Sequence, residues 1–275
     1  MSFGERLQAA FNTGGHLCVG IDPHQFLLAE WGLADDAAGL REFGLRVIDA
    51  ASTRVAIVKP QVAFFERHGS AGYAALEAVL AAARDAGLLV IADAKRGDID
   101  STFDAYAQAW LTPGSPLEAD ALTVSTYLGI GSVGSPHSIA EENGKGLFVL
   151  AATSNPEAFG LQTARLASGS TVAAGIVETV SKWNSGVTGL GSTGLVLGAT
   201  LDLSRFEIAE LGNTPVLAPG FGHQGARIAD LRSLYGTASG NVVVSASRSI
   251  LAAGPDGIGA AIEEQAAEVA EAVAA

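Results

Sequence analysis

Short apolar runs alternate along the chain with longer stretches in which apolar residues recur at helical spacing. Several of these runs are apolar almost throughout, which is typical of strands buried on both faces of a parallel sheet. We therefore predict eight strands, at His16–Asp22, Val55–Gln61, Leu88–Lys95, Ala121–Ser125, Gly146–Thr153, Thr193–Thr200, Thr214–Gly220 and Asn241–Arg248.

The stretches between the runs predict crossover helices. Gly72–Ala86 carries its apolar residues on one stripe, Ile258–Ala274 is an Ala- and Glu-rich closing helix, and a further helical stretch lies around Thr171–Lys182. This alternation fills the whole length and predicts one domain, residues 1–275, folded as a (β/α)8 TIM barrel.

A doubly wound open sheet is the competing arrangement, and it is expected to carry a glycine-rich dinucleotide turn after its first strand. Here the first strand ends in Gly-Ile-Asp-Pro, without that turn. Two loops are predicted to be long, Tyr127–Lys145 and Ser154–Ser192. Both follow strand ends, so in a barrel they lie on the C-terminal face, where active sites are found.

Composition supports a folded protein and narrows its partners. The chain has 275 residues, close to the roughly 250 of one such barrel, and 48% of them are apolar or aromatic. Its formal net charge of −13 repels phosphate backbones and anionic lipid, so nucleic acid and membrane surfaces are not expected partners.

The single cysteine, Cys18, lies in an apolar run, so no disulfide can form within the chain and we expect a buried core thiol. No run approaches the roughly 18 apolar residues of a membrane span, and the N-terminal stretch is amphipathic. We expect a cytoplasmic protein.

Charged residues gather at the end of the third predicted strand, in Asp-Ala-Lys-Arg-Gly-Asp (93–98). Residues two apart in a strand point the same way, so Asp93 and Lys95 project together, and Asp98 lies just beyond in the loop. An isolated Asp-x-Lys pair favours a plain salt bridge. The second strand ends close to Lys59, however, and a buried lysine needs a partner, which Asp93 can provide.

The motifs Asp-Ala-Lys-Arg-Gly-Asp-Ile-Asp-Ser-Thr, Val-Lys-Pro and Val-Gly-Ile-Asp-Pro together resemble the orotidine 5′-phosphate decarboxylases, specifically the bacterial branch with longer chains. The resemblance spans all eight strands. It implies a barrel that converts orotidine 5′-monophosphate into uridine 5′-monophosphate and carbon dioxide, as part of pyrimidine synthesis, without a metal or an organic cofactor.

The resemblance also implies roles for individual residues. Lys95 protonates C6 of the pyrimidine, and Asp93 lies beside the departing carboxylate. Lys59 binds ribose and holds Asp93, and Asp22 binds ribose as well. Loss of carbon dioxide leaves a carbanion at C6, so a lysine between two aspartates suits the need for a charged proton donor.

A homodimer with shared active sites is part of the same expectation, in which Asp98 and Thr102 come from the second subunit. For the phosphate, glycines after the seventh strand and Arg248 after the eighth form the usual barrel site, although glycines alone indicate only a tight turn. The resemblance places Gln224 and Arg248 on the phosphate.

The base contacts stay open. The pyrimidine edge is expected at the end of the fourth strand, at Ser125 or Thr126, where the longer bacterial branch carries an Asn-Pro pair and where ordinary strand-end packing is an alternative.

Two rival functions remain. One is a metal-dependent sugar-phosphate lyase or synthase, which shares Asp-x-Lys-x-x-Asp but needs an acid where this chain has Lys59. The other is a non-catalytic nucleotide-binding barrel, which does not need alternating charges. The five histidines lack ligand spacing, so no metal site is expected.

Overall fold

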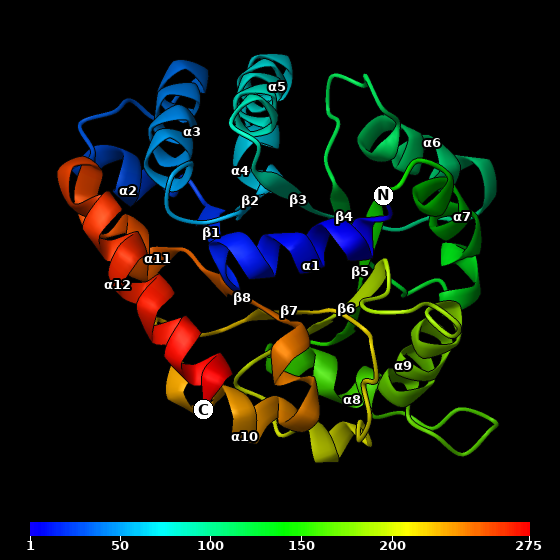
Figure 1. Cartoon of the computed structure of the whole chain (residues 1–275). Helices are drawn as coiled ribbons and strands as arrows, with labels where there is room; N and C mark the ends of the chain where they lie inside the picture. The colour runs from blue at the N-terminus through cyan, green and yellow to red at the C-terminus, as the bar shows by residue number, and fades with distance from the viewer.

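The computed structural model describes residues 1–275 and shows a closed barrel of eight parallel strands (Figure 1). Each strand pairs with the next along the chain, and the eighth pairs with the first. All eight predicted strands are confirmed, and their ends differ from the prediction by up to three residues. The strands are β1 (Leu17–Ile21), β2 (Ile57–Pro60), β3 (Leu89–Arg96), β4 (Ala121–Val124), β5 (Gly146–Ala152), β6 (Thr193–Leu197), β7 (Val216–Pro219) and β8 (Val242–Ala246).

Helices surround the barrel and bury their apolar stripes against the outer faces of the strands. They are α2 (Gln25–Glu30), α3 (Ala37–Ala51), α4 (Val62–Glu66), α5 (Gly69–Asp85), α6 (Asp100–Leu111), α7 (Gly134–Glu142), α8 (Phe159–Gln162), α9 (Val172–Trp183), α10 (Leu231–Tyr235), α11 (Arg248–Leu251) and α12 (Gly254–Ala274). Short 3-10 helices lie at η1 (Ile130–Val133), η2 (Pro156–Ala158), η3 (Leu203–Phe206), η4 (Ile228–Asp230) and η5 (Gly236–Asn241). The three predicted helices correspond to α5, α9 and α12.

Two connections differ from the prediction. Tyr127–Lys145 is not a long loop, because it contains η1 and α7, and α7 buries Pro136, His137 and Ala140 against the barrel. After β6, in contrast, the only helical turn is η3, which ends at Glu207 in the left-handed region with φ 59°. The sixth unit therefore lacks a full crossover helix.

Helix α1 (Phe3–Gly14) closes the N-terminal end of the barrel, and Figure 1 shows it lying across the ring of strands. Its apolar face, including Phe3 and Leu7, packs on side chains from inside the barrel such as Ile57 and Phe148. The Phe3 and Phe148 rings meet edge to face, with centroids 6.0 Å apart. The interior of the barrel is therefore filled at this end.

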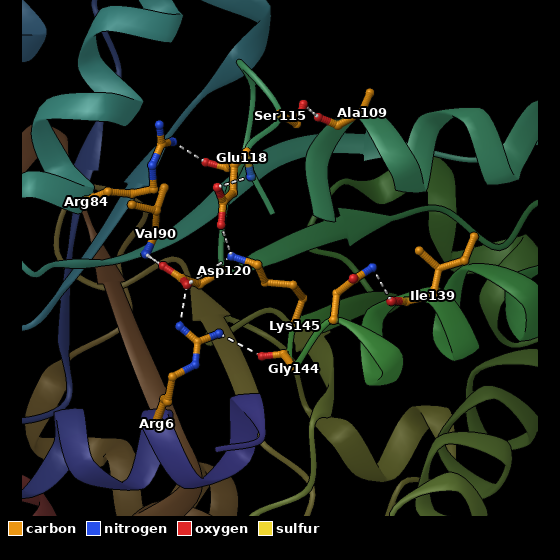
Figure 2. A network of polar contacts seen from close by, with 12 residues as sticks. Arg6, Arg84, Val90, Ala109, Ser115, Glu118, Asp120, Ile139, Gly144 and Lys145 are labelled. Carbon is orange, nitrogen blue, oxygen red and sulfur yellow. Dashed lines mark hydrogen bonds and ion pairs between the residues drawn. The ribbon is translucent and has the colours of Figure 1, made fainter. Parts of the chain in front are cut away.

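A network of buried charges fixes α1 to the strands that it covers (Figure 2). Arg6 of α1 donates to Asp120, at the start of β4, and to the carbonyl oxygen of Gly144 at 2.8 Å. The Lys145 ammonium lies 2.7 Å from Glu118 and 3.6 Å from Asp120. These side chains lie before β4 and β5, at the end of the barrel opposite the strand ends considered below.

Substitution of Lys145 by Met should lower the free energy of unfolding by about 3 kcal/mol, because two nearly buried carboxylates lose a counter-charge. Urea unfolding measures this change. The matched control is Lys182→Met, which breaks an exposed pair with Glu178 and should cost no more than about 0.5 kcal/mol. Equal losses in the two variants would show that the network does not stabilise the fold.

Candidate active site

A cavity of about 350 Å³ opens at the C-terminal ends of the strands, and every strand contributes to its wall or follows directly into it. The charged side chains predicted at the ends of β1, β2, β3 and β8 all line it. They are Asp22, Lys59, Asp93, Lys95 and Arg248. The structure thus brings together residues that are far apart in the sequence.

Asp93 is the centre of this array. Its Oδ2 lies 3.0 Å from Lys59 Nζ and its Oδ1 lies 2.5 Å from Lys95 Nζ. The side chains of Lys59 and Asp93 are 8% and 10% exposed, whereas that of Lys95 is 45% exposed. Lys59, Asp93 and Lys95 thus form an alternating array whose most accessible ammonium is on Lys95, whereas Asp98, the fourth member predicted from the sequence, does not contact it within the chain.

The charges in the array set one another's protonation. Burial by itself raises the pKa of Asp93, but the ammonium groups of Lys59 and Lys95 outweigh it and hold that pKa well below the ordinary carboxyl value. Burial likewise lowers the pKa of Lys59, and the charges of Asp93 and Asp22 more than reverse this, so the net shift is upward. Both groups are charged at neutral pH.

The end of β3 is irregular. Pairing between β3 and β4 shifts register between Ala92 and Arg96, and Lys95 has a left-handed φ of 48°. Such a conformation is uncommon for a residue with a Cβ atom. Despite this interruption of the strand, Asp93 and Lys95 project together as predicted.

Sequence reasoning missed two polar neighbours of Asp93. Thr123 of β4 donates from its hydroxyl to Asp93 Oδ1 at 3.0 Å. Gln61, just after β2, has its amide nitrogen 2.9 Å from Asp93 Oδ2 when the amide is oriented to donate. Single polar residues at strand ends gave no pattern in the sequence that marked them out.

At the side of the cavity formed after β7 and β8, Gln224 and Arg248 both line the wall, as predicted. Gly220 and Gly222 have φ values of 117° and 71°, so the turn needs glycine there. The half-buried guanidinium of Arg248 forms no ion pair within the chain. An unpaired cation beside glycine-rich backbone is suited to a phosphate.

Asp22 lines the cavity, and no protein group donates a hydrogen bond to its carboxylate. Its Oδ1 is buried and has no hydrogen-bond partner. His24 also lines the wall, with its ring centroid 4.4 Å from that of Phe64, and burial lowers its pKa. A buried carboxylate oxygen without a partner is costly, so Asp22 is suited to accept from a ligand hydroxyl.

Ser125 and Thr126 are not brought into this cavity. They line a neighbouring cavity, and the Thr126 hydroxyl donates to the carbonyl oxygen of Leu150 at 3.3 Å. Polar residues that follow β5, Ser154 and Asn155, line the cavity in their place. An available signal was missed, because the Asn-Pro pair expected after the fourth strand follows the fifth, at residues 155 and 156.

Asp98 and Thr102 also lie outside the cavity of their own chain. Asp98 is half-buried and its Oδ1 accepts from the backbone of Ile99 at 2.9 Å, while Thr102 is exposed in the first turn of α6. No group of three or more His, Cys, Asp or Glu side chains is placed to hold a metal ion.

Comparison with known proteins gives a consistent result. The model of the orotidine 5′-phosphate decarboxylase / HUMPS family matches residues 15–263. Orotidine 5′-phosphate decarboxylases of Salinispora arenicola and Streptomyces coelicolor are each 53% identical over 255 residues, which cover 93% and 92% of this chain and 91% of each relative. A crystal structure from Streptomyces avermitilis, provisionally assigned to the same enzyme, is 51% identical with a TM-score of 0.96, covering 100% of this chain and 96% of that one.

Substitution of Asp93 by Asn should lower the free energy of unfolding by about 3–5 kcal/mol near pH 7, because Lys59 stays buried without its main counter-charge. The pKa of Asp93 is depressed in the folded state, so its contribution is present above the ordinary carboxyl pKa of about 4 and is lost as pH falls further. The gap between wild type and variant should therefore shrink below about pH 4.

Urea unfolding at pH 7, 5 and 3 tests this. Asp49→Asn is the matched control, since Asp49 is exposed and forms no ion pair. A gap that stays constant down to pH 3, or a loss no larger than that of the control, would contradict the inferred charge state of the array.

Proposed function

The chain belongs to the orotidine 5′-phosphate decarboxylase family, and we propose that the cavity at the ends of its strands is the active site, with Lys95 as the proton donor. The protein converts orotidine 5′-monophosphate into uridine 5′-monophosphate and carbon dioxide in pyrimidine synthesis. The observation that carries the proposal is the contact of 2.5 Å between Lys95 Nζ and Asp93 Oδ1, inside a cavity open to ligands.

The reaction breaks the bond between C6 and the carboxyl carbon, and the electron pair stays on C6 as carbon dioxide leaves. The Lys95 ammonium stabilises this developing charge, donates a proton to C6 and becomes a neutral amine that solvent reprotonates. Asp93 keeps Lys95 charged before the transfer. No metal or organic cofactor takes part in these steps.

The remaining contacts follow the layout of the cavity. Arg248 and Gln224 bind the phosphate, and Asp22 and Lys59 bind the ribose hydroxyls. We assign the pyrimidine edge to Ser154 and Asn155 instead of Ser125 or Thr126, because the first pair lines the cavity that holds the charged array.

A homodimer with shared active sites accounts for Asp98 and Thr102, neither of which lines the cavity of its own chain. Large apolar side chains are exposed in the same region, after β3 and β4. They are Ile99 at 53%, Tyr106 at 37%, Tyr127 at 79% and Leu128 at 53%. An apolar surface of this kind is suited to a second copy of the chain, which would receive Asp98 beside its Lys95.

No helix has the length and apolar character needed to cross a bilayer. We place the enzyme in the cytoplasm, where its single, buried thiol of Cys18 stays reduced.

Lys95→Ala should abolish turnover, with a loss larger than the roughly 10²–10⁴-fold typical of general acid catalysis, because stabilisation of the carbanion is lost too. Binding of uridine 5′-monophosphate should persist, since the phosphate contacts remain. The absorbance of orotidine 5′-monophosphate reports the rate, and calorimetry reports binding. Lys182→Ala, on an exposed surface, is the control.

A Lys95→Ala variant that keeps a tenth of wild-type kcat would rule out the role of Lys95 as proton donor. Loss of wild-type activity on addition of a chelator would contradict the cofactor-free reaction.

Shared sites predict complementation between inactive variants. Lys95→Ala and Asp98→Ala homodimers should each be nearly inactive, whereas subunit exchange between them should restore activity. In a mixed dimer one site collects both defects and the other collects neither, so random exchange yields about a quarter of wild-type sites. Tagged pull-down verifies the exchange. If exchange occurs without recovery, Asp98 acts in its own chain.

A further inference from the structure

The carboxylate of Asp93 is held by four donors, two on each oxygen. Lys59 and Gln61 contact Oδ2 from the end of β2, at 3.0 and 2.9 Å. Lys95 and Thr123 contact Oδ1, at 2.5 and 3.0 Å. When the Lys95 ammonium turns towards a substrate, Thr123 is the one protein donor left on Oδ1.

The Thr123 hydroxyl also holds the backbone of Lys95. It accepts from the Lys95 N–H at 2.9 Å. A hydroxyl has one proton, and a carboxylate can only accept, so that proton is committed to Asp93 and none remains for a substrate. The Thr123 residue is only 1% exposed, which excludes water from competing for these two hydrogen bonds.

Both contacts are made where β3 departs from regular geometry. The register of β3 and β4 shifts between Ala92 and Arg96, and Lys95 occupies the left-handed region with φ 48°. An unfavourable backbone conformation persists only when surrounding contacts impose it. The Thr123 hydroxyl supplies such a contact, because it takes the place of a strand carbonyl as the acceptor for Lys95 N–H.

We propose that Thr123 is a positioning residue for the decarboxylation: its hydroxyl fixes Asp93 and the Lys95 backbone while the Lys95 ammonium exchanges Asp93 for C6 of the substrate. This role rests on the proposed function of Lys95. It goes beyond that function, because it makes a neutral side chain on β4 responsible for the position of the proton donor, Lys95.

Thr123→Val keeps the shape of the side chain and removes both hydrogen bonds. Its kcat for orotidine 5′-monophosphate should fall about 10- to 100-fold, the loss expected for a hydrogen bond to a charged group. KM should change by less than about threefold, because the phosphate and ribose contacts are intact. Thr123→Ser restores the hydroxyl and should recover kcat to within about threefold of wild type.

The matched control is Thr193→Val. Thr193 is also 1% exposed on a barrel strand, and its hydroxyl lies 3.0 Å from His137, remote from Asp93. This variant should lose stability in thermal unfolding while kcat is kept. A split between kcat and KM, with rescue by serine, is a result that a purely structural role of Thr123 would not give.

Three results would overturn the proposal: a Thr123→Val kcat within threefold of wild type, a Thr123→Ser kcat as low as that of the valine variant, or equal losses of kcat in Thr123→Val and Thr193→Val. If the valine variant does not fold, Thr123→Ala replaces it, and the serine variant must then be at least tenfold more active than alanine. Wild-type activity and its loss in Lys95→Ala test the proposed function separately, so either idea can fail alone.

Discussion

The burial of one carboxylate, Asp93, between two ammonium groups is the constraint on which the rest of the site depends. An isolated charge in this position would be strongly disfavoured, and neighbouring strands offset that cost by supplying donors to both of its oxygens. Those donors start from β2, β3 and β4, so the array exists only when the three strands keep their register. The strand pairing that closes the barrel is therefore also what sets the geometry of the active site.

The two ends of the barrel differ in whether their polar side chains have partners within the protein. At the N-terminal end, Asp120 is paired with both Arg6 of α1 and Lys145, and Arg6 and Asp120 also form hydrogen bonds with backbone groups. At the C-terminal end, a buried oxygen of Asp22 and the guanidinium of Arg248 have no partner. The filled end stabilises the fold, and the groups left unpaired at the open end are those that a sugar phosphate can satisfy.

Much of the fold follows from sequence because buried parallel strands appear as nearly continuous apolar runs, and Lys59, Asp93 and Lys95 stand out as charges at their ends. The roles of Thr123 and Gln61 do not follow, since one polar residue in a strand is common and its partner is fixed only by register between strands. Ser125 and Thr126 follow β4 at the expected end of the barrel but line a neighbouring cavity, although Thr123 of β4 lines the cavity that holds the charged array. Which of the two cavities such a residue lines depends on the direction of its side chain, and strand order alone does not give that direction.

The negative charge of the chain bears on how it recognises an anionic substrate. Remote carboxylates are screened over about 8–10 Å at physiological salt, so the charges near the cavity decide the interaction. Ten of the sixteen Lys and Arg residues form ion pairs within the chain. Of the other six, only Arg248 lines the cavity. The net charge of the protein offers no general attraction to anions. Arg248, beside the glycine-rich turn, is the one unpaired cation in the cavity, so a ligand is favoured when its own anionic group reaches that position.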